Sequence, residues 1–187
     1  MKPAGAEYAA VETGDGWLHA SGVAIGTTPM PYRLDYTLSC WDGYATRQLS
    51  VRVAGSGWTR GLELNRDTEG TWQVAVVADG DAGLRPPGGD AAALAGALDC
   101  DLGLSPLTNT MPVLRHGLLA GGEPVDLLMA WVSVPDLAVV PDAQRYRFVR
   151  SLDAGAVINY SSEGFSADVT FDASGLVVDY PGIAARA

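Results

Sequence analysis

The segment Leu98–Arg115, with the sequence LDCDLGLSPLTNTMPVLR, limits how the rest of the chain can fold. Pro106 and Pro112 lie six residues apart within it. Each proline lacks a backbone N–H donor and restricts the residue before it. A continuous helix and a central strand are therefore both excluded across Leu104–Pro112. Ser105, Thr108, Asn109 and Thr110 have short polar side chains, which form hydrogen bonds with the nearby backbone in turns. The sequence predicts an ordered, irregular segment, and such segments often carry function on a rigid scaffold.

Before this segment, the chain has the patterns of half-buried strands. Tyr32–Leu38 alternates apolar and polar residues, and Thr46–Val53 does the same with its apolar residues on one face. Asp42-Gly43 between them is typical of a turn. Strands are predicted over Trp17–Ala24, Tyr32–Leu38, Thr46–Val53, Gly61–Leu64 and Thr71–Val77.

After the segment, the strand patterns continue to the C-terminus. The last two form a hairpin, because Asp172-Ala-Ser-Gly175 supplies turn residues between two apolar runs. Strands are predicted over Val113–Leu119, Val125–Val132, Gln144–Arg150, Val157–Tyr160, Phe165–Phe171 and Leu176–Tyr180.

Helical signals are few. Asp90–Leu98 predicts a helix of about two turns, because Asp90 can cap it and alanines and leucines follow. Residues 1–16 are expected to be frayed, and residues 1–187 to form a single domain. No βαβ alternation occurs, so the fold class is mainly β, α+β at most, with antiparallel pairing. This many strands must curl into a barrel, a half-barrel or a sandwich, and patterning alone leaves the three open.

Composition limits the partners. The chain of 187 residues has a formal net charge of −10 and a pI of about 4.4. Nucleic acid is a poor partner for so acidic a protein, and anionic membrane surfaces should repel it. Neutral or cationic partners are expected. No signal peptide and no run of about eighteen apolar residues is present, so neither export nor membrane insertion is expected. Cys40 and Cys100 are therefore expected to be reduced thiols in a cytoplasmic protein, and a disulfide between them is the less favoured alternative.

The central segment resembles the putative glycolipid-binding protein family, which began as a domain of unknown function. The residues that carry the resemblance in this segment are Cys100, Asp101, Leu102, Pro106, Thr108, Asn109, Thr110, Pro112 and Arg115. Weaker matches extend over most of the chain, at Trp41 with Thr46-Arg47, Gly70-x-Trp72, Pro135-x-Leu137, Gln144-x-Tyr146 and Leu176–Pro181. Where the family has two consecutive basic residues, this chain has Leu114-Arg115.

The resemblance implies a particular fold and ligand. Its fold would be a strongly curved antiparallel half-barrel with one or two short helices, similar to bacterial lipoprotein carriers. Its ligand would be a glycolipid or related amphiphile held in the concavity of the sheet. No cofactor or metal is implied.

Asp99 and Asp101 are the best candidates among the carboxylates for catalysis, metal binding or ligand binding. In an extended segment they share one face with Cα atoms roughly 7 Å apart, a spacing compatible with an inverting glycosidase or a divalent cation. The favoured interpretation is that they cap backbone amides and hold the following irregular segment in place, and the next is that they hydrogen-bond a ligand. Cys100 between them is typical of a buried structural cysteine, since no basic partner is evident for a thiolate.

The leading functional hypothesis is a soluble binding protein for an amphiphile, with Thr108, Asn109 and Arg115 at its polar end and tryptophans at its apolar end. Arg47 and Arg115 could each pair with a ligand anion or with an internal aspartate. Alternatives are a hydrolase for a glycoside or ester that uses Asp99 and Asp101, and a protein-interaction scaffold; an enzyme is the less favoured class, and a homodimer is allowed. The candidate ligand-binding residues are Trp41, Arg47, Trp72, Asp99, Asp101, Thr108, Asn109, Arg115 and Tyr146.

Overall fold

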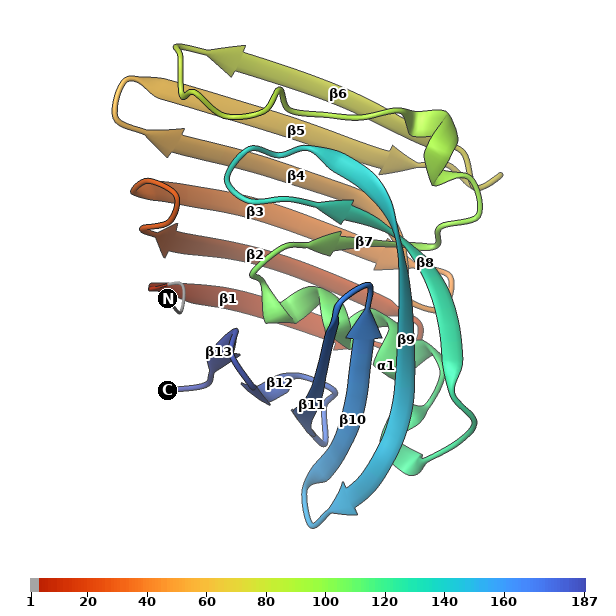
Figure 1. Cartoon of the computed structure of the whole chain (residues 1–187). Helices are drawn as coiled ribbons and strands as arrows, with labels where there is room; N and C mark the ends of the chain where they lie inside the picture. Colours follow the sequence, from red (N-terminus) through yellow and green to blue (C-terminus); the bar gives the residue numbers. More distant parts are fainter. Residues whose placement is uncertain (1–3) are drawn as a thin grey trace.

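The computed structural model describes residues 4–187 as two β-sheets with short helical turns between them (Figure 1). The first sheet is a meander in which each strand pairs antiparallel with the next. Its strands are β1 (Gly5–Gly14), β2 (Trp17–Gly26), β3 (Tyr32–Trp41), β4 (Ala45–Gly55), β5 (Trp58–Arg66) and β6 (Trp72–Asp79).

The second sheet is curled into a half-barrel and has the strand order β13-β12-β11-β10-β9-β8-β7. In Figure 1 the long strands β8 and β9 bend strongly along their length. Its strands are β7 (Asp99–Leu102), β8 (Val125–Val132), β9 (Val139–Leu152), β10 (Gly155–Ser162), β11 (Phe165–Asp172), β12 (Val177–Tyr180) and β13 (Ala184–Ala185). The predicted class, mainly β with a curved half-barrel and short helices, is confirmed.

Alternating burial explains why these residues form strands. In β3 the apolar residues of the predicted alternation, Tyr32, Leu34, Tyr36 and Leu38, are buried, and the residues between them are not. Leu49, Val51 and Val53 of β4 follow the same pattern. Side chains of a strand point alternately to its two faces, so each strand contributes every second residue to the core.

One strand pair departs from the expected antiparallel pattern. β7 and β8 run parallel, with Asp99 opposite Met129 and Leu102 opposite Val132. A parallel pair needs a long crossover connection. Residues 103–124 supply it through the helical turns η2 (Pro106–Asn109), α1 (Thr110–Arg115) and η3 (Leu118–Ala120).

These turns overturn the predicted strand over Val113–Leu119. Pro106 begins η2 and Pro112 lies in the first turn of α1. The first amide groups of a helix have no intrahelical partner, so a proline there costs no hydrogen bond. The prolines thus permit short helical turns where an irregular segment was expected.

The predicted helix Asp90–Leu98 is shorter than expected. Only the 3-10 turn η1 (Ala91–Leu94) forms, and Asp90 caps it by accepting the Ala92 N–H at 2.9 Å. Ala95 is the C-cap of the turn, and Gly96 after it has a positive φ of 89°, a conformation that glycine adopts without strain.

The expectation that residues 1–16 fray is wrong for Gly5–Gly14, which pair with β2 from Gly5 opposite Gly26 to Gly14 opposite Trp17. Ala9 and Val11 of β1 pack against the core, and this burial holds the edge strand in place. Residues 1–3 lie outside the described part of the chain.

Helix α1 lies between the two sheets (Figure 1). Its Met111 belongs to the core of the first sheet, and its Val113 belongs to a second core lined by β8–β12. Cys40 and Cys100 are free thiols, as expected, and both are buried. None of the helices in residues 4–187 is long and apolar enough to cross a membrane.

Replacing Leu38 by alanine tests the core of the first sheet. Leu38 has no exposed surface, so L38A should lower the free energy of unfolding by about 2–5 kcal/mol through lost burial and the cavity left behind. Val77 of β6 is 73% exposed, and V77A is the control, with a change of about 0.5 kcal/mol or less. Urea denaturation measures both. Equal effects would contradict the assigned core.

Candidate functional site

Strand β7 places two buried aspartates between the sheets. All four of its residues are buried. The strand is held against β4 of the first sheet, where Thr46 N–H donates to Leu98 O at 3.0 Å and Cys100 N–H donates to Thr46 Oγ1 at 3.0 Å. β7 therefore links the two sheets.

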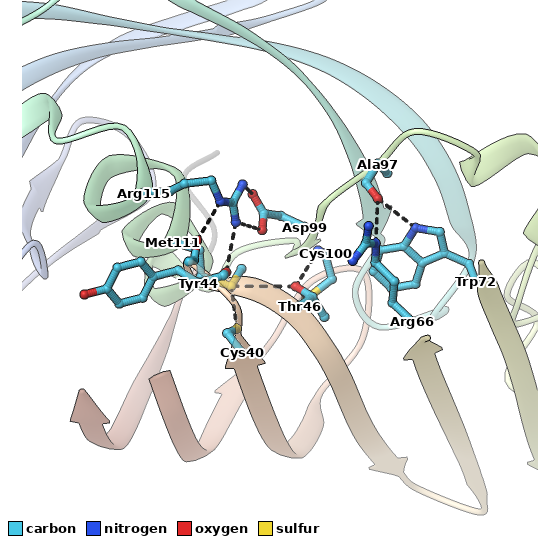
Figure 2. Close-up of polar contacts among 11 residues, drawn as sticks. Cys40, Tyr44, Thr46, Arg66, Trp72, Ala97, Asp99, Cys100, Met111 and Arg115 are labelled. Carbon is cyan, nitrogen blue, oxygen red and sulfur yellow. Dashed lines mark hydrogen bonds and ion pairs between the residues drawn. The ribbon is translucent and has the colours of Figure 1, made fainter. Parts of the chain in front are cut away.

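Asp99 forms an ion pair with Arg115, which reaches it from the end of α1 (Figure 2). Arg115 Nη1 donates to Asp99 Oδ2 at 2.7 Å, and Nη2 donates to Oδ1. The same guanidinium donates to Gly43 O at 2.8 Å and to Tyr44 O at 2.9 Å. Burial raises the pKa of Asp99, and Arg115 opposes that rise. Arg115 therefore joins α1, β7 and the β3–β4 turn.

Asp101 is buried without such a cation. Thr108 Oγ1 donates to its Oδ1 at 2.7 Å, and Gln144 Nε2 donates to its Oδ2 at 2.7 Å. No ion pair joins Asp101 to an arginine or lysine within residues 4–187. Burial therefore raises the pKa of Asp101, and the two hydrogen bonds only partly oppose the rise.

A second hydrogen-bonded group adjoins Asp101. Tyr146 Oη donates to Asn109 Oδ1 at 3.0 Å and lies 3.2 Å from Gln144 Oε1. Asn109 Nδ2 donates to Pro106 O at 3.3 Å. Gln144 Nε2 also donates to Asp142 Oδ2 at 2.9 Å. The central segment and β9 therefore share one polar network.

This network opens onto a hollow of about 750 Å³, which we call the larger groove. Asp101, Asn109 and Asp142 are polar parts of its lining. The aromatic residues that line it are Trp131, Tyr160, Phe165 and Tyr180. The groove thus has a hydrogen-bonding part and an aromatic part.

A second hollow of about 550 Å³, the smaller groove, lies between the sheet edges formed by β1–β2 and by β12–β13. Most of its lining is aliphatic, although Glu7 also lines it. Glu7 Oε1 accepts hydrogen bonds from Tyr36 at 2.7 Å and from Ser105 at 2.6 Å. Leu104 and Ile183 line both grooves, so the two hollows adjoin there.

The residues predicted for the site do not all lie at one place in the structure. Asp101 and Asn109 line the larger groove, and Thr108 and Tyr146 bond to them from behind its wall. Asp99 and Arg115 line neither groove.

The remaining three predicted residues also lie apart from the grooves. Trp41 is 52% exposed and stacks on Trp17 with ring centroids 6.2 Å apart. Arg47 is exposed and donates to Arg66 O at 3.4 Å. Trp72 is buried, and its Nε1 donates to Ala97 O at 3.0 Å (Figure 2).

Several lining residues were missing from the predicted site, among them Asp142, Tyr160, Phe165 and Tyr180. They belong to β9, β10, β11 and β12, which are not neighbours of β7 in the sheet. Only the curling of the half-barrel brings them to the same groove as Asp101. Gln144 could have been chosen as a site residue from the sequence, because it is part of the motif Gln144-x-Tyr146.

The cysteines lie in a buried sulfur cluster. Cys40 Sγ donates to Met111 Sδ at 2.9 Å, and Thr46 Oγ1 lies 3.5 Å from Cys100 Sγ (Figure 2). Burial raises the pKa of Cys100 to about 12, so its thiol stays protonated at neutral pH. The cluster packs β3, β4, β7 and α1 together. Within residues 4–187, no three His, Cys, Asp or Glu side chains gather as metal ligands would.

Removing Arg115 should leave a buried carboxylate without its cation. We expect R115M to lower the free energy of unfolding by about 3–5 kcal/mol. The double variant D99N/R115M should lose less than the sum of the two single variants, because the unpaired charge is then absent. Urea denaturation of the four proteins gives this cycle. Strictly additive losses would contradict the pairing.

Two threonines of the Thr-Asn-Thr segment form a matched pair. T108V removes a donor to buried Asp101 and should cost about 1–3 kcal/mol of unfolding free energy. Thr110 Oγ1 is buried without a hydrogen-bond partner in the described residues, so T110V should leave stability unchanged or raise it. Thermal and urea unfolding measure both, and a larger loss in T110V would refute the assigned network.

Comparison with known proteins is consistent with this architecture. The chain matches the family model described as "Putative glycolipid-binding" over residues 1–186. It is similar to a solved structure described as a DUF1089 family protein from Pseudomonas aeruginosa, with 32% sequence identity and a TM-score of 0.72. That similarity covers 97% of this chain and 92% of the other. No curated protein matches the chain. The resemblance inferred from the central segment is confirmed, and the chain belongs to the "Putative glycolipid-binding" family.

Proposed function

We propose that this protein is a soluble, cytoplasmic binding protein for an amphiphile, a glycolipid or a related lipid. The polar end of the amphiphile occupies the larger groove, and its apolar chain extends into the smaller groove. The observation that carries the proposal is the contact between the two hollows at Leu104 and Ile183, which joins a polar, aromatic space to an aliphatic one.

The larger groove supports a polar ligand end. Asp101 and Asn109 present oxygen acceptors, and both are held by donors from the protein, so their positions are set before a ligand arrives. Aromatic rings beside them can cover the apolar faces of a sugar or headgroup. Convergent polar groups in a mostly apolar hollow are typical of small-molecule sites.

The smaller groove supports an apolar chain. Ala6, Ile25, Leu107 and Val177 line it, and Glu7 is tied to Tyr36 and Ser105 rather than left free. Burying an alkyl chain there would contribute about 0.8 kcal/mol for each CH₂ group. Both volumes, about 550 and 750 Å³, fall within the range of ligand pockets, roughly 300–1,000 Å³.

The geometry favours binding over the hydrolase that uses Asp99 and Asp101. Two catalytic carboxylates must flank one scissile bond. Here Asp101 lines the larger groove, whereas Asp99 lines neither groove and is bound by Arg115. The pair therefore does not face a common space.

Lipid extraction tests the proposal directly. Protein purified without detergent is extracted with organic solvent, and the extract is analysed by mass spectrometry. We expect a co-purified amphiphile, retained after gel filtration. Extracts without any amphiphile, together with failure to bind added alkyl glycosides, would refute the function.

Leu104 offers a variant that keeps the fold and alters the junction of the grooves. Leu104 has a positive φ of 67°, which asparagine tolerates better than leucine, and its side chain is 43% exposed. L104N should keep stability and weaken decyl glucoside binding at least several-fold, because apolar surface is lost at the junction. Leu98 is 37% exposed and lines neither groove, so L98N is the control. Equal affinity in L104N and L98N, measured by calorimetry, would contradict the joined site.

A further inference from the structure

Charge is distributed unevenly around the larger groove. Asp101, Asp136, Asp142 and Glu163 line it, and Arg85 is the one basic residue of its lining in residues 4–187. Arg85 is already neutralised, because its Nε donates to Asp136 Oδ2 at 2.7 Å. The groove therefore presents carboxylates that have no protein counter-charge.

Two of these carboxylates are joined through one amide. Gln144 Nε2 donates to Asp101 Oδ2 at 2.7 Å and to Asp142 Oδ2 at 2.9 Å. Neither aspartate takes part in an ion pair within the described chain. Burial raises the pKa of Asp101, and the nearby negative charge of Asp142 raises it further. A cation placed beside them would remove this repulsion.

Aromatic rings adjoin the two carboxylates. Tyr160, Phe165 and Tyr180 are mutually tilted, with ring centroids 5.9 to 6.2 Å apart. Aromatic faces attract cations, most strongly where water is excluded. Tyr180 is only 6% exposed, lines the groove, and its hydroxyl has no hydrogen-bond partner among residues 4–187. The hydroxyl oxygen is not among the buried atoms of the described chain, so it is accessible from the groove and available to a ligand.

We propose that the larger groove selects amphiphiles whose polar end carries a positively charged amino group, with Asp101 and Asp142 as counter-charges and Tyr160, Phe165 and Tyr180 around it. This inference rests on the proposed function and names its ligand class. An ammonium group has the N–H donors that both carboxylates and the Tyr180 hydroxyl can accept. An anionic headgroup would meet four acidic side chains.

Three probes with the same alkyl chain separate the possibilities. Decylammonium, decyl glucoside and decyl phosphate are titrated into the wild-type protein by calorimetry at pH 7, below their micelle-forming concentrations. Decylammonium should bind at least about tenfold more tightly than decyl glucoside, and decyl phosphate should bind most weakly. Increasing salt should weaken decylammonium binding and leave decyl glucoside binding nearly unchanged.

Asp142 and Asp153 give a matched pair of variants. D142N removes one groove carboxylate, and the asparagine Oδ1 can still accept from Gln144 Nε2. Asp153 is exposed in the β9–β10 turn and lines neither groove, so D153N changes the net charge equally at a distance. D142N should weaken decylammonium binding about tenfold with little effect on decyl glucoside, and D153N should leave both unchanged.

Each outcome decides the matter. Equal losses in D142N and D153N would show a general charge effect and overturn the inference. Tighter binding of decyl glucoside than decylammonium would overturn the inference while the proposed function stands. Failure of all three probes to bind would overturn both. If D142N does not fold, the ranking of the three probes on the wild-type protein decides.

Discussion

The ion pair between Arg115 and Asp99 is the interaction on which the arrangement of the two sheets depends. It joins the end of α1 to β7, and the same guanidinium holds the backbone of the β3–β4 turn. Both charges are largely removed from water, so either one alone would be costly to bury. The pair thus determines how α1 lies between the first sheet and the half-barrel.

The two aspartates of β7 have different roles because their surroundings differ. Asp99 has an internal cation, whereas Asp101 has only neutral donors from Thr108 and Gln144. Asp101 also lines the larger groove, beside Asp142 and the aromatic cluster. A carboxylate without an ion-pair partner, such as Asp101, is tolerated at a binding site because a bound ligand can supply the missing positive charge or hydrogen-bond donor. Ligand binding by the proposed function would therefore also stabilise β7.

Strand prediction succeeded where one face of a strand is buried, as in β3 and β4. The alternation of apolar and polar residues is the same whichever strands lie beside it, so it can be recognised from the sequence. It failed where tertiary context dominates. Val113 and Leu118 occupy helical turns because the crossover between parallel strands β7 and β8 must cover the second core. Gly5–Gly14 form an ordered strand only because β2 and the core lie beside them.

The sequence by itself determined the mainly β class, the family and the importance of the segment Leu98–Arg115, since local spacing and residue chemistry carry that information. The tertiary structure alone decided that Arg115 pairs internally with Asp99, that Trp41 and Trp72 lie apart from the grooves, and that Asp142, Tyr160 and Tyr180 line the same groove as Asp101. These residues come from strands far apart in the chain, and their proximity depends on strand order and sheet curvature, which local patterns do not encode.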